Sequence, residues 1–172
     1  MRITSLKLES VNDLLIAELR DLHSAEEQLV EALPKMAEAA SSMELKNAFS
    51  QHLEETRNHV TRLEEIFKGL GEKATGETCQ AMKGLVKEGE EFIKAEGQPD
   101  VRDAGLIGAA QRVEHYEMAG YGTARTLAKR LGFQNIAATL DKTLEEERAA
   151  DEKLTTVAES DVNVTAARVA TK

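Results

Sequence analysis

Four long stretches of this chain repeat apolar residues at steps of three, four and seven positions, and this repeat constrains the fold most strongly. The stretches cover about residues 11–40, 43–70, 101–131 and 133–160. Their spacing is that of an α-helix with one buried face. A weaker repeat covers about residues 78–95. We therefore predict an all-α protein, an antiparallel four-helix bundle with a short extra helix in the connection between the second and third long helices.

The composition and length support one helical domain. Aromatic residues make up 3% of the 172 residues, which leaves too few strand-forming side chains for a large sheet. We place a single bundle domain at residues 1–160 and a polar tail, expected to fray, at residues 161–172. Pro34 should bend the first helix about one turn back, because proline removes a backbone donor and clashes with the carbonyl of Val30.

The charge and the single cysteine exclude several classes of function. The net charge of −9 argues against binding to nucleic acids or to a membrane surface, because both are anionic. Cys79 has no second cysteine to pair with, as is usual in a reducing compartment. The sequence shows no signal peptide and no apolar run of about 18 residues. These features predict a cytoplasmic protein.

Acidic residues interrupt the apolar face of every long helix. Burying a carboxylate costs several kcal/mol unless it is paired or bound to a cation. The inward-facing candidates, in chain order, are Glu26, His52, Glu55, Glu114, Glu117, Glu147 and Asp151. His52 and Glu55 are three residues apart, so both side chains project from one helical face and can reach one metal ion. The same holds for Glu114 and Glu117.

A pair of metal ions is the simplest charge that could compensate these acids. Carboxylates with one or two imidazoles suit iron or manganese, with zinc as a further candidate. Glu55 and Glu147 are the expected bridging ligands. Thr56, His59 and Tyr121 are the expected hydrogen-bonding neighbours of the ligands. For any one of the acids taken alone, a solvated helix face or an interhelical salt bridge is the alternative interpretation.

Four segments resemble the YciE/YciF family of ferritin-like proteins: residues 19–35 (LRDLHSAEEQLVEALPK), 52–64 (HLEETRNHVTRLE), 113–122 (VEHYEMAGYG) and 144–154 (LEEERAADEKL). The resemblance implies a ferritin-like bundle with a di-metal centre, a homodimer and a link to bacterial stress response. The family's ligand positions match Glu26, His52, Glu55, Glu114, Glu117 and Glu147. The chain departs from ferritin itself, because it lacks two clear Glu-x-x-His motifs.

Three functions are consistent with these motifs. The first is a metal-dependent oxidase or peroxide-handling protein, in which two carboxylate-bridged metals bind and reduce dioxygen or peroxide. The second is a non-catalytic structural or interaction protein of the stress response, with its bundle held by metals or ion pairs. The third is an iron store or DNA-protecting cage, which the acidic composition and the nearly uncharged tail disfavour.

Overall fold

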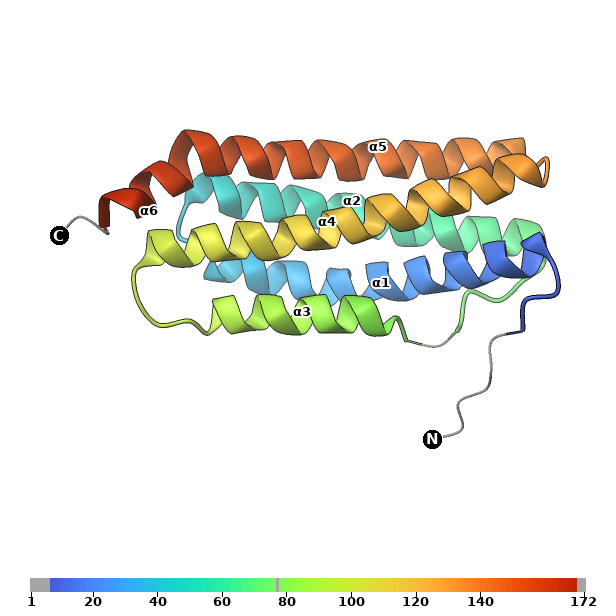
Figure 1. Cartoon of the computed structure of the whole chain (residues 1–172), viewed down its shortest axis with the longest axis horizontal. Coiled ribbons are helices and arrows are strands. Elements are labelled where there is room, and N and C mark those ends of the chain that lie inside the picture. The colour runs from blue at the N-terminus through green and yellow to red at the C-terminus, as the bar shows by residue number, and fades with distance from the viewer. Residues whose placement is uncertain (1–6, 77, 170–172) are drawn as a thin grey trace.

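Four long helices lie side by side and form the body of the molecule (Figure 1). The structure is a computed structural model and describes residues 7–76 and 78–169, in which every regular element is a helix. The long helices are α1 (Val11–Ala39), α2 (Met43–Leu70), α4 (Pro99–Arg130) and α5 (Gln134–Val157). The predicted all-α bundle is confirmed.

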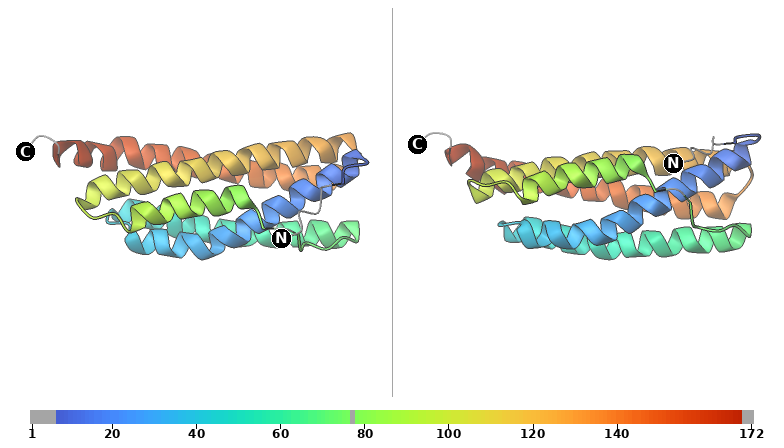
Figure 2. Two further views of the ribbon diagram at one scale, coloured as in Figure 1. Left: turned by 60° about the horizontal axis from the view of Figure 1, so that its bottom comes forward. Right: turned by 90° about the horizontal axis from the view of Figure 1, so that it is seen from below.

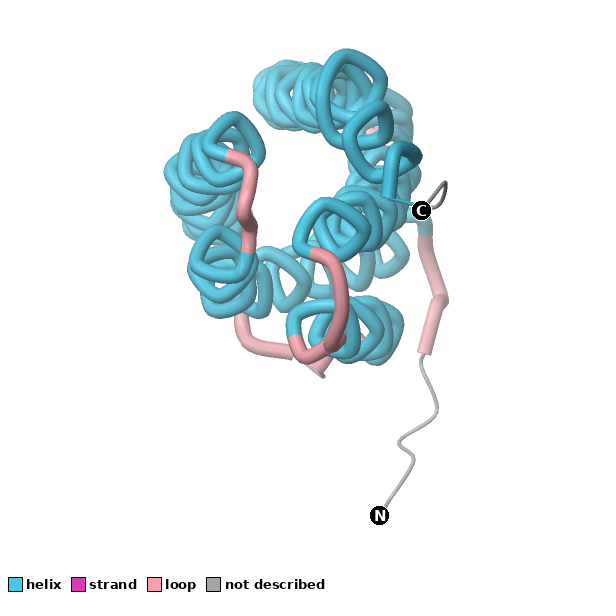
Figure 3. Tube along the Cα trace, turned by 90° about the vertical axis from the view of Figure 1, so that its left-hand side faces the viewer, coloured by secondary structure: helices cyan, strands magenta, loops and turns pink. Residues whose placement is uncertain are grey.

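The bundle consists of two antiparallel hairpins, α1–α2 and α4–α5 (Figure 1). The short helix α3 (Gln80–Ile93) carries the chain back along the bundle between them and packs against α1 and α4. This is the extra helix predicted between the second and third long helices. Seen along the helix axes, the connections α1–α2 and α3–α4 both lie at the near end (Figure 3).

Local sequence signals set the helix ends. The Ser10 hydroxyl accepts a hydrogen bond from the backbone N–H of Asp13 and caps α1, and Ser42 caps α2 in the same way. Gly71 ends α2 with φ 69°, a left-handed conformation that glycine adopts without a side-chain clash. Helix α1 continues through Pro34 and changes direction along its length (Figure 2).

The C-terminal region is helical where the sequence predicts a frayed tail after residue 160. Helix α5 passes through a π-helical turn, η1 (Ala158–Val162), into α6 (Asn163–Val169). The physical reason is burial, because Ala158 and Val162 pack into the apolar core. Residues 170–172 of the predicted tail lie outside the described residues.

The core has two apolar clusters, one toward each end of the bundle. One includes Leu29, Leu33, Phe49, Leu106 and Leu154, and the other includes Leu15, Leu19, Leu63, Phe67 and Leu140. Buried polar residues fall between the residues of the two clusters: His52, Thr56 and His59 of α2, Glu114 and Glu117 of α4, and Glu147 of α5. Glu26 of α1 joins them, because its carboxylate faces His59. We call this middle layer the polar belt. No helix among the described residues is both long and apolar enough to cross a membrane.

Candidate metal centre

Four buried carboxylates meet in the polar belt. They belong to Glu26 of α1, Glu114 and Glu117 of α4, and Glu147 of α5, and none is more than 2% exposed. Each occupies a position where the helical repeat calls for an apolar side chain, so assembly of the bundle buries it. Burying four acids together is strongly unfavourable unless their charge is compensated.

Two histidines of α2 supply nitrogen atoms to the polar belt. His52 and His59 are both buried and lie seven residues, or about two turns, apart. Nε2 of His52 lies 3.5 Å from Glu114 Oε2 and 3.6 Å from Glu147 Oε2. Nδ1 of His59 lies 3.3 Å from Glu26 Oε1 and 3.0 Å from Glu147 Oε1. The carboxylate of Glu147 therefore lies between the two imidazoles, with one oxygen toward each.

The outer nitrogen of each histidine faces a second carboxylate. His52 Nδ1 lies 3.3 Å from Glu55 Oε2, and His59 Nε2 lies 3.0 Å from Glu146 Oε2. Arg62 holds Glu146 in place by donating to both of its oxygens. A carboxylate on the outer nitrogen fixes the ring orientation and takes the ring proton. The inward nitrogen is then left with a lone pair for a ligand.

Eight buried atoms of the polar belt have no hydrogen-bond partner among the described residues. They are Glu26 Oε2, His52 Nε2, His59 Nδ1, Glu114 Oε2, both carboxylate oxygens of Glu117 and both of Glu147. Buried polar atoms nearly always have a partner in native proteins. Five of these atoms face an opposite charge at 3.0–3.6 Å without hydrogen-bond geometry, whereas Glu26 Oε2 and both Glu117 oxygens have no ion pair either among the described residues. Together they indicate a site for a non-protein ligand, and a cation suits carboxylate oxygens and imidazole nitrogens together.

The donor atoms form two sets that share one residue. The first set is His52, Glu114, Glu117 and Glu147, and the second is Glu26, His59 and Glu147; within each set the donor atoms lie within 4.8 Å of one another. Carboxylate and imidazole donors suit iron or manganese. The charge of four carboxylates also balances that of two divalent cations. The residues of each set could therefore hold a metal ion, and Glu147 belongs to both sets.

The pKa values show how the same charges are compensated by protons. Burial raises the pKa of Glu114 to about 8, and burial with repulsion from neighbouring carboxylates raises the pKa of Glu117 well above its usual range. Burial alone would lower the pKa of both histidines, but the surrounding carboxylates outweigh it. They raise the pKa of His52 to about 9 and that of His59 to about 11. Protons and metal ions therefore compete for the same atoms.

Five of the seven residues predicted as ligands come together in the polar belt: Glu26, His52, Glu114, Glu117 and Glu147. The structure places Glu55 outside both donor sets, with its side chain 32% exposed and against the outer nitrogen of His52. Asp151 also lies outside, where it accepts a hydrogen bond of 3.0 Å from Gln111 and lies 3.5 Å from His115 Nε2. Glu55 and Glu147 were both predicted as bridging ligands. Of the two, Glu147 belongs to both donor sets and Glu55 to neither.

The three residues predicted to hydrogen-bond around the ligands differ in their placement. Tyr121 is fully buried and donates to Glu26 Oε1, as expected of a neighbour to a ligand. The Thr56 hydroxyl is also buried, but it donates to the backbone carbonyl of His52 in its own helix at 2.9 Å. His59 lies inside the second donor set, so its position is that of a ligand.

Sequence reasoning missed Glu146 as the partner of His59 and Arg62 as the partner of Glu146. Glu146 stands in a run of three acids, residues 145–147, and the sequence pattern alone does not tell which of them face inward or pair with a histidine. The seven-residue spacing of His52 and His59 was the available signal for a second inward histidine, because this spacing returns to the same helical face.

Comparisons with known proteins agree with this description. The family described as Domain of unknown function (DUF892) matches residues 10–167. Protein YciF of Escherichia coli K12 is 45% identical over 159 residues, which cover 92% of this chain and 96% of YciF. This chain is thus a homologue of YciF, which is described as a stress protein of E. coli.

Solved structures share the fold over nearly the whole chain. The E. coli YciF structure has a TM-score of 0.87 and covers 91% of this chain and 99% of its own. YcfI of Rhodopseudomonas palustris, named as a candidate structural protein, is 42% identical with a TM-score of 0.85, covering 92% and 99%. A protein of Xanthomonas campestris pv. campestris, 21% identical with a TM-score of 0.74, shares the fold over 92% and 98%. The chain therefore belongs to the DUF892 family, the YciF type of ferritin-like helical bundle.

Proposed function

We propose that this protein binds two metal ions, iron or manganese, in the polar belt and uses them in an oxidase or peroxide-handling reaction of the stress response. The observation that carries the proposal is the convergence of eight buried atoms without partners on two donor sets. Ion pairs reach five of these atoms, but Glu26 Oε2 and both oxygens of Glu117 have neither an ion pair nor a hydrogen bond among the described residues, which an ion-pair network alone does not explain. The likeness to the E. coli stress protein supplies the physiological context.

The chain's own residues have distinct roles in this proposal. Glu147 links the two positions, because each of its oxygens faces a different histidine. Glu55 and Glu146 orient the imidazoles from outside. The apolar clusters on both sides of the belt limit its contact with water, which strengthens the electrostatic interactions within it. Bound iron or manganese would supply the one-electron chemistry that reduces dioxygen or peroxide.

Elemental analysis tests the metal centre directly. Protein purified without chelators, then loaded with Fe(II) or Mn(II) under anaerobic conditions and desalted, is expected to retain about two ions per chain. The double variant Glu26→Ala, Glu117→Ala removes one ligand from each set and should lose this metal. Stoichiometric metal in that variant would show that the ions bind elsewhere.

A kinetic measurement tests the reaction. Fe(II)-loaded protein is expected to consume hydrogen peroxide or dioxygen faster than the same concentration of free Fe(II), because the metals are held together and water is excluded. The matched comparison is the double variant with an equal amount of added iron. Equal rates for the loaded protein and free iron would remove the oxidase or peroxide function and leave metal binding in place.

A structural role is the second candidate. The Rhodopseudomonas relative is named as a candidate structural protein, and two ion pairs, Arg62–Glu146 and Lys153–Glu44, join α2 to α5 on either side of the polar belt. In this case the protein would contain less than about one metal ion per chain, and added chelator would leave its melting temperature unchanged. A large fall in melting temperature on chelation would exclude a purely ion-paired bundle.

A further inference from the structure

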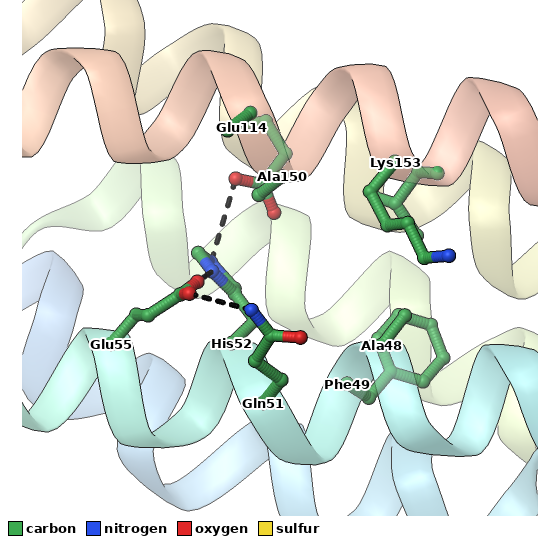
Figure 4. Close-up of a pocket in the computed structure, with 10 residues that line it drawn as sticks. Ala48, Phe49, Gln51, His52, Glu55, Glu114, Ala150 and Lys153 are labelled. Carbon is green, nitrogen blue, oxygen red and sulfur yellow. Dashed lines mark hydrogen bonds and ion pairs between the residues drawn. The ribbon is translucent and has the colours of Figure 1, made fainter.

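The two donor sets differ in their relation to the surface of the bundle. A cavity of about 70 Å³ lies between α2 and α5 next to the first set. His52 and Glu114 form part of its wall, together with Ala48, Phe49, Gln51, Glu55, Ala149, Ala150, Lys153 and Leu154. Figure 4 shows His52 and Glu55 of α2 on one side, with Glu114 and Ala150 on the other.

The walls of this cavity are apolar and its rim is polar. Phe49 and Leu154 lie on the wall, whereas Gln51, Glu55 and Lys153 offer polar groups near the surface. The space exists because α5 presents two alanines, Ala149 and Ala150, toward α2. A larger side chain at either position would extend into it. Since a water molecule needs about 10–15 Å³ of such space, the cavity is large enough for a molecule of a few non-hydrogen atoms.

The second donor set is covered. Glu26, His59 and Tyr121 have no exposed surface. Arg62 joins α2 to α5 outside His59, by donating to Glu146 and, at 3.1 Å, to the Thr143 hydroxyl. On the other side of the cavity, the ion pair Lys153–Glu44 joins the same two helices at 2.9 Å. The cavity is thus a gap between two cross-links of the α2–α5 seam.

We propose that this cavity is the access route by which a small oxidant, dioxygen or hydrogen peroxide in size, reaches the centre at the side of His52 and Glu114. The inference rests on the proposed metal centre and adds to it that the two positions are unequal. A small ligand from solvent can reach a metal ion held by the first donor set. A metal ion held by the second donor set is closed to it.

The experiment uses azide, a probe of three non-hydrogen atoms, on iron-loaded, oxidised protein. Azide binding to ferric iron gives a visible charge-transfer band, so the readout is independent of turnover. Ala150→Leu adds three carbon atoms inside the cavity, and Ala150→Val adds two. We expect the rate of azide binding to fall at least tenfold in Ala150→Leu and less in Ala150→Val, with the iron content of both variants unchanged.

Ala138→Leu is the matched control, because Ala138 lies on the same helix, is exposed and is absent from the cavity wall. It should bind azide at the wild-type rate. Wild-type azide binding in folded, iron-loaded Ala150→Leu would overturn the access route while the metal centre stands. If Ala150→Leu does not fold, an unchanged rate in Ala150→Val overturns it. Wild-type protein that binds no iron would overturn the metal centre and the access route together.

Discussion

Helix α4 carries two fully buried carboxylates whose surroundings are opposite. Asp103, near the start of the helix, accepts hydrogen bonds from the backbone N–H groups of Ser41 at 3.0 Å and Ser42 at 2.7 Å. Glu117, near its middle, has no partner for either oxygen among the described residues. Both side chains have no exposed surface. Asp103 holds the α1–α2 connection against α4, whereas Glu117 belongs to the first donor set.

The comparison teaches that burial of an acid does not by itself indicate a metal site. A buried carboxylate can be satisfied by backbone N–H groups, and it then contributes to stability. An unsatisfied carboxylate is costly for the metal-free fold. Within one helix, Asp103 has hydrogen-bond partners for its carboxylate and Glu117 has none among the described residues, so the two acids are expected to respond differently to substitution.

The largest expected effect belongs to Glu147, the residue common to both donor sets. Glu147→Ala should lose both metal ions, because the variant removes a ligand from each position and the shared charge between them. Plasma mass spectrometry of the reloaded protein measures this. Asp151→Ala is the control, an acid one turn further along α5 that lies outside both sets, and it should keep its metal. Loss of metal in both variants would break the distinction drawn here.

The next effect is the pH dependence of the metal-free protein. The folded-state pKa of Glu114 is raised from 4.5 to about 8 and that of His52 from 6.5 to about 9. At a pH between the ordinary pKa of each group and its raised pKa, the folded state binds more protons than the unfolded state. The free energy of unfolding therefore falls as pH rises through this range. Each unit of raised pKa corresponds to about 1.4 kcal/mol, and the loss between about pH 5 and pH 9 should reach several kcal/mol.

Thermal melting of chelated protein at pH 5, 7 and 9 checks this sign. Metal affinity should change in the opposite direction and rise with pH, because protons compete for the same donor atoms. Glu114→Gln removes one titrating group and should flatten the stability profile. A melting temperature of the chelated protein that rises from pH 5 to pH 9 would contradict the charge compensation described for the polar belt.

Substitution of the two α4 acids should separate stability from metal binding. Asp103→Ala leaves the N–H groups of Ser41 and Ser42 without an acceptor, and we expect it to lower the free energy of unfolding by about 2–4 kcal/mol with metal content unchanged. Glu117→Gln should leave the stability of the metal-free protein within about 1 kcal/mol and weaken metal binding. Urea unfolding and elemental analysis of both variants give the two readouts. The same response in both variants would contradict the comparison.

The sequence predicted the bundle because the apolar repeat covers almost the whole length of each long helix. It also predicted five residues of the polar belt, since an acid at an apolar position is visible without a structure. The burial of Asp103 could not be predicted from the sequence, because its hydrogen-bond partners lie in a connection about 60 residues earlier. Val162 was overlooked because the short apolar residues of this segment, three valines and three alanines in residues 161–172, form no clear helical repeat.

Helix α2 shows why ligand assignment was less successful. A step of three residues, from His52 to Glu55, leaves the side chains about 60° apart around the helix, whereas the seven residues to His59 leave about 20°. His59 therefore faces the polar belt beside His52, and Glu55 turns toward its edge. The i, i+3 rule identifies residues that can contact each other, and Glu55 does contact His52. It does not establish that both contact the same third group.

The smallest effect is expected at the carboxylates that orient the histidines. Glu55→Gln keeps the size of the side chain and removes the charge that holds the outer nitrogen of His52, so metal affinity at the first donor set should fall about tenfold. Glu54→Gln is the control, since Glu54 is exposed and its partner is Arg57. Competition against a calibrated chelator resolves the two sites. Because Arg62 holds Glu146 against His59, Glu146→Gln should weaken the second site at least as much. A larger loss in Glu55→Gln than in Glu146→Gln would mean that Glu55 binds metal directly, and the set of ligands would then extend to the edge of the cavity.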